Sequence, residues 1–434
     1  MPNIITEQIC SGVNLNYIPE QKFKTALLSF SMITPMDRET VSKNAIIPNL
    51  LAHSCKKYPS LLEINTKLEE LYGACAISKV SKLGDKQLLT IAIQSVGNNY
   101  IPDSSDNILE ITKLLNEMIF SPNASDNAFD SKDFSQEKRQ LIEDIESELN
   151  NKRIYVNRKC TEVMCKDEKF GISPIGTIED ARKLDAKTVF EEWKNLLKSS
   201  HIEIMVIGSC NHKLVFNEFK KNFDLLEREE SIIPQDTVIK EVKVIKEVSE
   251  HMDVVQCKLV MGFRTEIAKP DKEVEAAKVM NALLGGTPQS KLFLNVREKL
   301  SLCYYCSSNY IPAKGILFID SGVQKENIEK AKKEILNQVE DIKLGNFSET
   351  ELSETKMFLA QAIEKTKDKL GALHTWYCNQ TLDETKYSPD EMIEKINKVQ
   401  REDVINAAQK LKLDTVYTLL GKESGESESE INNK

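Results

Sequence analysis

The sequence LLGGTPQSKLFLNVREKLSLCYYCSSNY, residues 283–310, organises the chain because it joins two helices to a strand. Before it, in residues 271–284, apolar side chains recur at 274, 277, 280, 283 and 284, which is helical spacing. Gly285 and Gly286 are predicted to stop this helix. A second helix is predicted from Pro288, which a first helical turn tolerates, to Lys299, and a strand carrying Tyr304 follows.

Arg297 and Tyr304 are the candidate functional pair in this stretch, seven residues apart. A basic side chain at a helix end and a phenol on the adjoining strand can reach the same cavity. Both groups donate hydrogen bonds, and both can therefore stabilise a carbonyl oxygen or an oxyanion. The alternative is structural: Arg297 interacts with the helix dipole and Tyr304 belongs to the core. Spacing alone favours the structural alternative, because such pairs are common.

Length and composition predict a globular protein of two domains. The chain has 434 residues, of which 41% are hydrophobic and 29% charged, so sizeable cores are expected. A net charge of -9 argues against nucleic acid or an anionic membrane as the main partner. The chain shows neither a signal peptide nor an apolar run of membrane-spanning length, and we therefore expect it in the cytoplasm, with no membrane partner.

The ten cysteines are predicted to be structural, as in proteins of a reducing compartment. Cys303 and Cys306 lie three residues apart, and on a regular strand their side chains point to opposite faces. Cys160 and Cys165 show no second pair at the spacing of a zinc site. Neither pair is therefore expected to bind a metal or to do redox chemistry.

A linker divides the sequence into two halves. Residues 224–240 are charged, contain a proline and lack a period, which is typical of an interdomain linker. This predicts an N-terminal half over 1–223 and a C-terminal half over 241–420. Residues 421–434 are too polar to bury and are predicted to form a disordered acidic tail.

The order of predicted elements after the linker repeats the order before it. The strand VVQCKLVMGF corresponds to TALLSFSMI, the hairpin CYYCSSNY–GILFIDSGV to CAISKV–LLTIAIQSV, and the helix FSETELSETKMFLAQAIEK to FSQEKRQLIEDIESEL. The fold class predicted is α+β, with two similar halves, each a mostly antiparallel sheet packed with helices. Two such halves are expected to enclose a cavity.

Nearly the whole chain resembles the insulinase/pitrilysin metallopeptidases. The motifs that carry the resemblance are SKLFLNVREKLSLCYY, FSQEKRQLIEDI, GISPIGTIEDARKLDAKTVFEEW and the strand ending MVIGSC. The resemblance implies the mitochondrial-processing-peptidase/LuxS-like metallohydrolase fold. In this family an arginine and a tyrosine seven apart help to bind substrate and to stabilise the transition state. Arg297 and Tyr304 match that pair, so the resemblance favours the functional interpretation.

The family's zinc site is not matched. Active members carry an HxxEH helix and a later glutamate as the third zinc ligand. The resemblance places Ala45, Pro48 and Asn49 at the histidine, glutamate and histidine positions, and Asp144, seven residues after Glu137, at the distal carboxylate. Alanine cannot bind zinc, asparagine is a poor ligand and proline is no general base. The resemblance therefore implies a chain with no metal of its own and no activity alone.

No independent catalytic centre is predicted elsewhere. His53 and Cys55 lack further ligands and are expected to be ordinary surface or boundary residues, and the chain has no phosphate loop or dinucleotide motif. The resemblance implies a zinc-less subunit that forms a heterodimer with a zinc-bearing paralogous subunit and acts on a peptide substrate. In isolation, a homodimer is the alternative assembly. A non-enzymatic scaffold and a peptide-binding module with the same fold are the alternative functions.

Overall fold

A computed structural model describes residues 4–102, 105–383 and 385–421 of the chain. The predicted acidic tail lies outside the described residues except for Gly421. The described residues form two compact units. The first unit comprises residues 4–102, 105–147, 172–236, 365–383 and 385–389, and the second comprises 148–171, 237–364 and 390–421. No helix among the described residues is both long and apolar enough to cross a membrane.

The first unit is built on a six-stranded sheet whose strands follow the order β1-β2-β8-β3-β5-β4. Only the pair β2 and β8 is parallel. In the order of the sheet, the strands are β1 (Ile5–Cys10), β2 (Val13–Ile18), β8 (His201–Ile207), β3 (Thr25–Pro35), β5 (Lys86–Val96) and β4 (Cys75–Leu83). A two-residue hairpin, β6 (Ala124–Ser125) and β7 (Ala128–Phe129), lies apart from this sheet.

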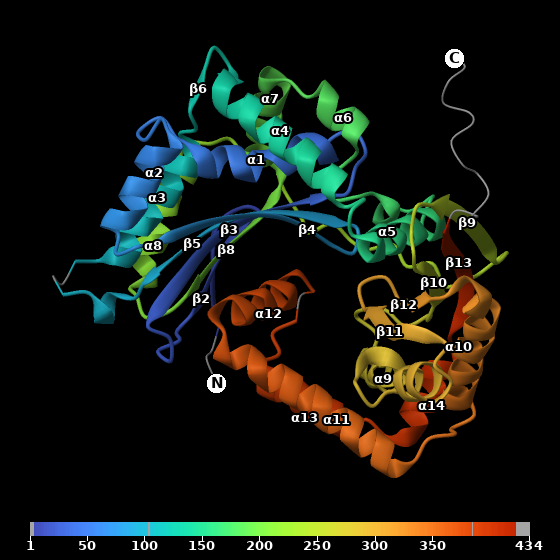
Figure 1. Cartoon of the computed structure of the whole chain (residues 1–434). Coiled ribbons are helices and arrows are strands. Elements are labelled where there is room, and N and C mark those ends of the chain that lie inside the picture. Colours follow the sequence, from blue (N-terminus) through green and yellow to red (C-terminus); the bar gives the residue numbers. More distant parts are fainter. Residues whose placement is uncertain (1–3, 103–104, 384, 422–434) are drawn as a thin grey trace, which may run out of the picture. The chain divides into compact units, whose positions relative to one another are not determined.

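Helices cover both faces of this sheet, but unequally (Figure 1). Seven helices lie on one side of the sheet and share one apolar core with Leu28, Phe30 and Met32 of β3. They are α1 (Val41–His53), α2 (Leu61–Glu70), α3 (Asn107–Phe120), α4 (Ser131–Ser147), α6 (Ile178–Lys183), α7 (Ala186–Ser199) and α8 (His212–Phe223). The opposite face carries α12 (Leu370–Leu382), which packs on Leu27 of β3 and on its neighbours in β2, β5 and β8.

Turn residues set the strand boundaries. The sequence of residues 4–18 favours one strand, but the structure divides it into β1 and β2. Gly12 between them has φ +67, a conformation that favours glycine. The predicted hairpin CAISKV–LLTIAIQSV is confirmed: it turns at Gly84 and Asp85, with β4 and β5 paired in register on either side.

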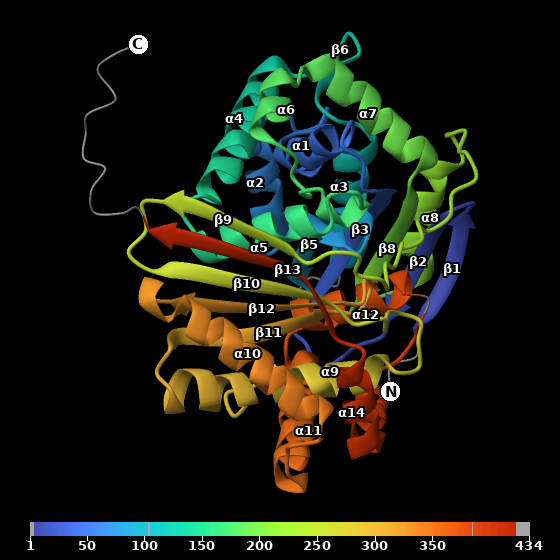
Figure 2. The same cartoon turned by 90° about the vertical axis from the view of Figure 1, so that its right-hand side faces the viewer.

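The second unit is built on a five-stranded sheet with the order β9-β13-β10-β12-β11, and Figure 2 shows these strands side by side. The strands are β9 (Lys246–Met252), β13 (Lys412–Gly421), β10 (Cys257–Arg264), β12 (Ile316–Val323) and β11 (Cys303–Ile311). Only β9 and β13 are parallel. This matches β2-β8-β3-β5-β4 strand for strand, which confirms the predicted repeat and fold class.

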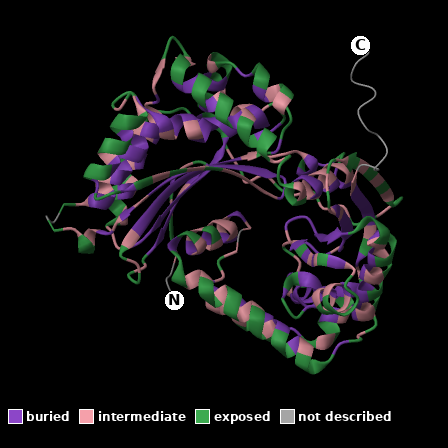
Figure 3. Cartoon of the chain, in the orientation of Figure 1, coloured by how far each residue is buried: buried purple, intermediate pink, exposed green. Residues whose placement is uncertain are grey.

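The helices of the second unit repeat the unequal arrangement. Figure 3 shows that their outward faces are exposed while the strands are mostly buried. One sheet face packs against α5 (Lys152–Met164), mainly through Val156, Cys160 and Met164. The remaining helices of this unit are α9 (Val274–Asn281), α10 (Ile328–Lys343), α11 (Glu349–Glu364), α13 (Pro389–Lys398) and α14 (Arg401–Gln409).

The two halves exchange equivalent helices. In the first half α5 follows α4, yet it belongs to the second unit, and in the second half α12 follows α11, yet it belongs to the first unit. The compact units therefore differ from the contiguous ranges 1–223 and 241–420 predicted from the sequence. The physical reason is that each sheet has two apolar faces, and the helix that buries the second face comes from the other half.

The predicted linker, 224–240, contains no helix or strand, but it is attached to the first unit. Asp236 accepts a hydrogen bond of 2.6 Å from the backbone N–H of Asp85 and forms an ion pair with the buried Lys86. Arg228 donates to the carbonyl of Ser200 at 2.6 Å and to that of Leu197. The linker is thus held against the end of α7 at Arg228 and against the β4–β5 turn at Asp236.

We predict that Asp236→Asn accelerates cleavage of the linker by proteases about 10-fold or more, because a charge-assisted hydrogen bond contributes about 1.5 to 3 kcal/mol. Limited proteolysis followed by mass spectrometry measures the rate. Glu230→Gln, at an exposed position of the same linker, is the matched control and should cut at the wild-type rate. Equal rates for both variants would show that the ion pair does not hold the linker.

A second prediction concerns His374 of α12, which is half-buried and packs against Ser29 of β3, with its Nε2 2.6 Å from the serine Oγ. Burial, and to a smaller extent the charge of Lys79, lowers the pKa of His374 to about 4. The unfolded chain therefore binds more protons than the folded chain between about pH 6.5 and 4. Stability is full above this window and falls as the pH decreases through it, by about 3 kcal/mol in total.

His374→Gln removes this titration, so its stability should fall less than that of the wild type between pH 7 and pH 4. Urea unfolding at several pH values gives the difference. His251→Gln, at an exposed histidine, should behave like the wild type. If the free energies of unfolding of His374→Gln and the wild type differed by the same amount at every pH from 7 to 4, His374 would not be the group that titrates.

Candidate functional site

Two π-helical segments lead to the candidate pair in the second unit. The helix α9 continues past its predicted stop as η3 (Ala282–Gly286), and the second helix, predicted from Pro288, forms η4 (Leu292–Lys299). A Cβ at Gly285 would lie 2.6 Å from the backbone nitrogen of Ser308 in β11, so only glycine permits this close approach. π-Helical turns are rare and often lie at functional sites.

Arg297 lies in the last turn of η4, as predicted. Its guanidinium sits over the ring of Phe293, 4.6 Å from the centroid, and 3.4 Å from a carboxylate oxygen of Glu298. The side chain is 40% exposed, and both contacts are to residues of the same helix. Arg297 is therefore held near the surface of the second unit with most of its donors available.

Tyr304 lies at a β-bulge near the start of β11. Cys303 pairs with Val323 and Tyr305 pairs with Gly322, so Tyr304 is the extra residue of the bulge. Its side chain is 58% exposed, and its hydroxyl accepts a hydrogen bond of 3.3 Å from Gln324. Tyr304 is thus not a core residue. No hydrogen bond joins it to Arg297 in the part of the chain that the structure describes.

The same bulge corrects the prediction for Cys303 and Cys306. An extra residue between them shifts the alternation of the strand, so both thiols lie on its buried face. The hydrogen bond from Cys306, with contributions from Ser321 and from the charge of Arg297, outweighs burial and lowers the pKa of Cys303 to about 7. The two thiols are free.

In the first unit, the three positions at which the resemblance places the family's HxxEH residues lie on α1. Ala45 and Pro48 are buried, and Asn49 is half-buried, with its Oδ1 accepting a hydrogen bond of 2.6 Å from Ser78 of β4. The helix continues through Pro48, although proline removes one backbone hydrogen bond. Ala45 and Pro48 therefore serve packing, and of the three positions only Asn49 offers a polar group, its side-chain amide.

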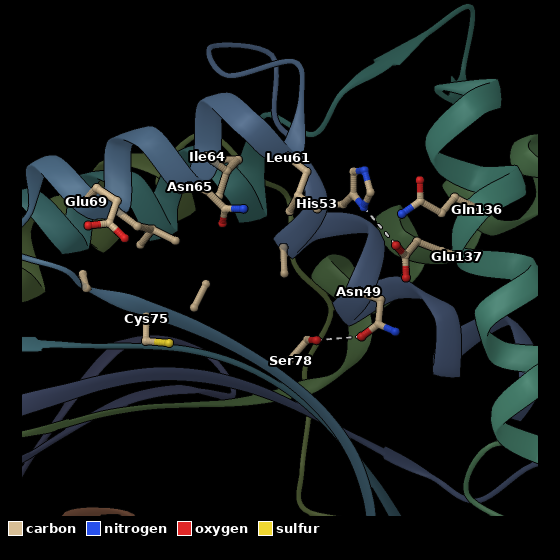
Figure 4. A pocket seen from close by; sticks show the side chains of 14 residues that line it. Asn49, His53, Leu61, Ile64, Asn65, Glu69, Cys75, Ser78, Gln136 and Glu137 are labelled. Carbon is tan, nitrogen blue, oxygen red and sulfur yellow. Dashed lines mark hydrogen bonds and ion pairs between the residues drawn. The ribbon is translucent and has the colours of Figure 1, made fainter. Parts of the chain in front are cut away.

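A pocket of about 570 Å³ adjoins Asn49. It is lined by α1, α2, β4 and α4, and Figure 4 shows the side chains that enclose it. Asn49, His53, Gln136 and Glu137 lie toward one end of the pocket, and Glu69 lies toward the other. Its lining residues are Asn49, Ala52, His53, Leu61, Ile64, Asn65, Leu68, Glu69, Ala74, Cys75, Ala76, Ser78, Gln136 and Glu137.

His53 belongs to a buried ionic cluster that the sequence analysis missed. It was predicted to be an ordinary surface or boundary residue, but it is buried, as is Cys55. Its Nδ1 lies 2.9 Å from Glu137 and its Nε2 lies 3.5 Å from Asp133. Asp133 also accepts a hydrogen bond of 2.5 Å from Ser54. The spacing of Asp133 and Glu137, four residues apart on α4, was the available sign of a shared face.

These donors do not fit the zinc ion that the family uses. Asp144, predicted at the distal carboxylate position, is exposed and accepts a hydrogen bond of 2.8 Å from Gln140 of its own helix, and it does not line the pocket. Ala45 supplies no donor atom, and the Asn49 amide is a weak ligand. Among the described residues, no group of three histidine, cysteine or carboxylate side chains is placed to hold a metal ion.

Comparison with known proteins connects both units to one family. The family model described as "Peptidase M16 inactive domain" matches residues 183–359. A Bacillus subtilis protein described as "Probable inactive metalloprotease YmfF" is 31% identical over 412 residues, which are 95% of this chain and 96% of that protein.

Solved structures agree with this match. A conserved protein from Enterococcus faecalis V583 is 30% identical, with a TM-score of 0.90 over 97% of this chain and 99% of that chain. A protease from Helicobacter pylori, 17% identical, shares the fold with a TM-score of 0.79 over 96% of this chain and 99% of that chain. The chain therefore belongs to the M16 peptidase family, as its motifs predicted, and is similar to a member described as a probable inactive metalloprotease.

Proposed function

We propose that the chain is a zinc-less subunit of an M16-type peptidase and supplies Arg297 and Tyr304 to a zinc-bearing paralogous partner that hydrolyses peptides. The observation that carries this proposal is the exposure of the pair. Tyr304 is 58% exposed at a bulge, and the Arg297 side chain is 40% exposed on the adjoining helix. Neither residue is used to build the core of the second unit.

The chemistry of the pair suits transition-state stabilisation. When a peptide bond is attacked, negative charge develops on the carbonyl oxygen, and a phenol and a guanidinium can both donate hydrogen bonds to it. Bulges often re-aim side chains next to active sites. The partner would supply the metal, because the first unit of this chain lacks the donors to hold one.

The first unit supports a role in holding the peptide. Strand β4 lies at the edge of its sheet, so its outer backbone groups face no neighbouring strand in the six-stranded sheet. An extended peptide can add to such an edge by main-chain hydrogen bonds, with alternate side chains entering pockets. The pocket of about 570 Å³ borders β4 at Cys75, Ala76 and Ser78.

Zinc analysis tests the first part of the proposal. We expect the purified chain, after mild dialysis, to contain far less than one zinc per molecule and to cleave no peptide alone. The reason is that stable zinc sites need three or four well-placed nitrogen, sulfur or carboxylate donors. About one tightly held zinc per chain, together with chelator-sensitive proteolysis, would contradict the zinc-less assignment.

Kinetics with a zinc-bearing partner test the second part. Removing one preorganised donor to an oxyanion typically lowers kcat about 10² to 10³-fold, or about 2.7 to 4 kcal/mol. We therefore expect Tyr304→Phe and Arg297→Ala to lower kcat by about this factor, with a smaller change in KM. Arg297→Lys should restore activity only in part, because an ammonium group lacks the planar fork of arginine.

Neighbouring positions provide matched controls for these variants. Tyr305→Phe changes the next phenol of β11, and Lys299→Ala removes another basic side chain of η4, and both should leave kcat nearly unchanged. Size-exclusion chromatography and metal analysis should show intact, zinc-loaded heterodimers throughout. Wild-type turnover in both Tyr304→Phe and Arg297→Ala would favour a non-enzymatic scaffold or peptide-binding module.

A further inference from the structure

The pocket of the first unit combines an apolar wall with a polar end. Ala52, Ile64, Leu68 and Ala74 form part of the wall, whereas Asn49, His53, Gln136 and Glu137 gather at one end (Figure 4). Pockets that bind small ligands or side chains have this combination of an apolar lining with a few placed polar groups. The arrangement favours a ligand group with an aliphatic stem and a polar head.

Glu137 gives that polar end a free acceptor. The residue is 9% exposed, and its Oε1 lies 2.9 Å from Nδ1 of His53. Its other carboxylate oxygen, Oε2, has no hydrogen-bond partner among the described residues, although Glu137 lines the pocket. A carboxylate oxygen in such a confined place gains most from a hydrogen bond with a cationic donor.

The charges around the pocket also select a cation. The lining includes two carboxylates, Glu69 and Glu137, and no lysine or arginine. The one basic group is His53, which already lies between Glu137 and Asp133. Asp133 lies behind the lining, and together with Glu137 it outnumbers His53, so this cluster keeps an excess of negative charge even when His53 carries a proton.

We propose that this pocket binds the side chain of a lysine in the peptide, with the ammonium group on Oε2 of Glu137. That the lysine belongs to a peptide rests on the proposed function. The four-carbon stem of lysine packs along Ile64 and Leu68. Asn49 adds a further acceptor, because its Oδ1 receives one hydrogen bond from Ser78 and keeps a second lone pair.

Lysine fits this end better than arginine does. A guanidinium binds a carboxylate best through two parallel hydrogen bonds to both oxygens, and here His53 occupies one of them. An ammonium group is a point charge and needs only the free oxygen. The pocket therefore favours lysine over arginine because Glu137 has only one carboxylate oxygen available to the ligand.

Binding to the purified chain tests the inference without a partner. Fluorescence anisotropy compares dye-labelled peptides of six residues that differ only at one central position, which is lysine, norleucine, acetyl-lysine or arginine. A hydrogen bond to a charged group is typically worth about 10- to 100-fold in affinity. The lysine peptide should bind tighter than the norleucine and acetyl-lysine peptides by about this factor, and tighter than the arginine peptide. Equal binding of the lysine and norleucine peptides would overturn the inference.

Variants locate the effect. Glu137→Gln should weaken the lysine peptide to the level of the norleucine peptide, whereas Glu143→Gln, at an exposed position of the same helix, should keep the wild-type preference. A lysine preference that survives in a folded Glu137→Gln protein would overturn the assignment. Should that variant not fold, the comparison of peptides on the wild type still decides. If an equal concentration of pentylamine displaced the lysine peptide, the pocket would bind a free amine equally well. That result would overturn the claim that its ligand is a lysine of a peptide.

This test is separable from that of the proposed function. Binding is measured on the single chain, and turnover is measured with the partner. A lysine preference together with unchanged turnover in the Arg297 and Tyr304 variants would remove the catalytic role and support the pocket inference. Reduced turnover in those variants together with equal binding of the lysine and norleucine peptides would overturn only the pocket inference.

Discussion

A buried charge cluster holds the second unit together. The guanidinium of Arg264, 2% exposed, lies 2.6 Å from Glu168 and 3.1 Å from Asp414, and the ammonium of Lys314, 0% exposed, lies 3.4 Å from Glu168. Burial disfavours the charge of Arg264, but its bonds to Glu168 and Asp414 more than compensate and raise its pKa. Removing one partner from such a cluster would leave an uncompensated buried charge, which costs about 3 to 5 kcal/mol.

The position of this cluster explains its importance. Glu168 follows α5, the helix donated by the first half, while Arg264 ends β10 and Lys314 lies in the turn between β11 and β12. The cluster thus fixes the exchanged segment 148–171 to the sheet and to the hairpin whose first strand begins with the bulge at Tyr304. The turn of the hairpin that carries Tyr304 is thus fixed by a segment about 140 residues earlier in the chain.

The sequence predicts those features that depend on local pattern. Helical spacing, turn residues and the repeated order of elements predicted the paired hairpins, the strand with Tyr304 and the equivalent sheets of the two units. The exchange of α5 and α12 was not predicted, because each helix has similar spacing whichever sheet it covers. The bulge at Tyr304 was missed because one extra residue leaves no mark in the composition, and His53 was missed because its partners lie about 80 residues away.

The exchange of helices affects the order in which the chain can fold during synthesis. Leu370, Leu373 and Tyr377 of α12 cover Ile18, Leu27, Ala92, Met205 and Ile207 on one face of the first sheet. All strands of that sheet have been made once residue 207 leaves the ribosome, yet this face stays open to water until α12 emerges more than 160 residues later. At about 5 to 20 residues per second, the nascent protein carries an apolar sheet face for roughly ten to thirty seconds. We expect a chaperone that binds exposed apolar surface to act on the nascent chain during that interval.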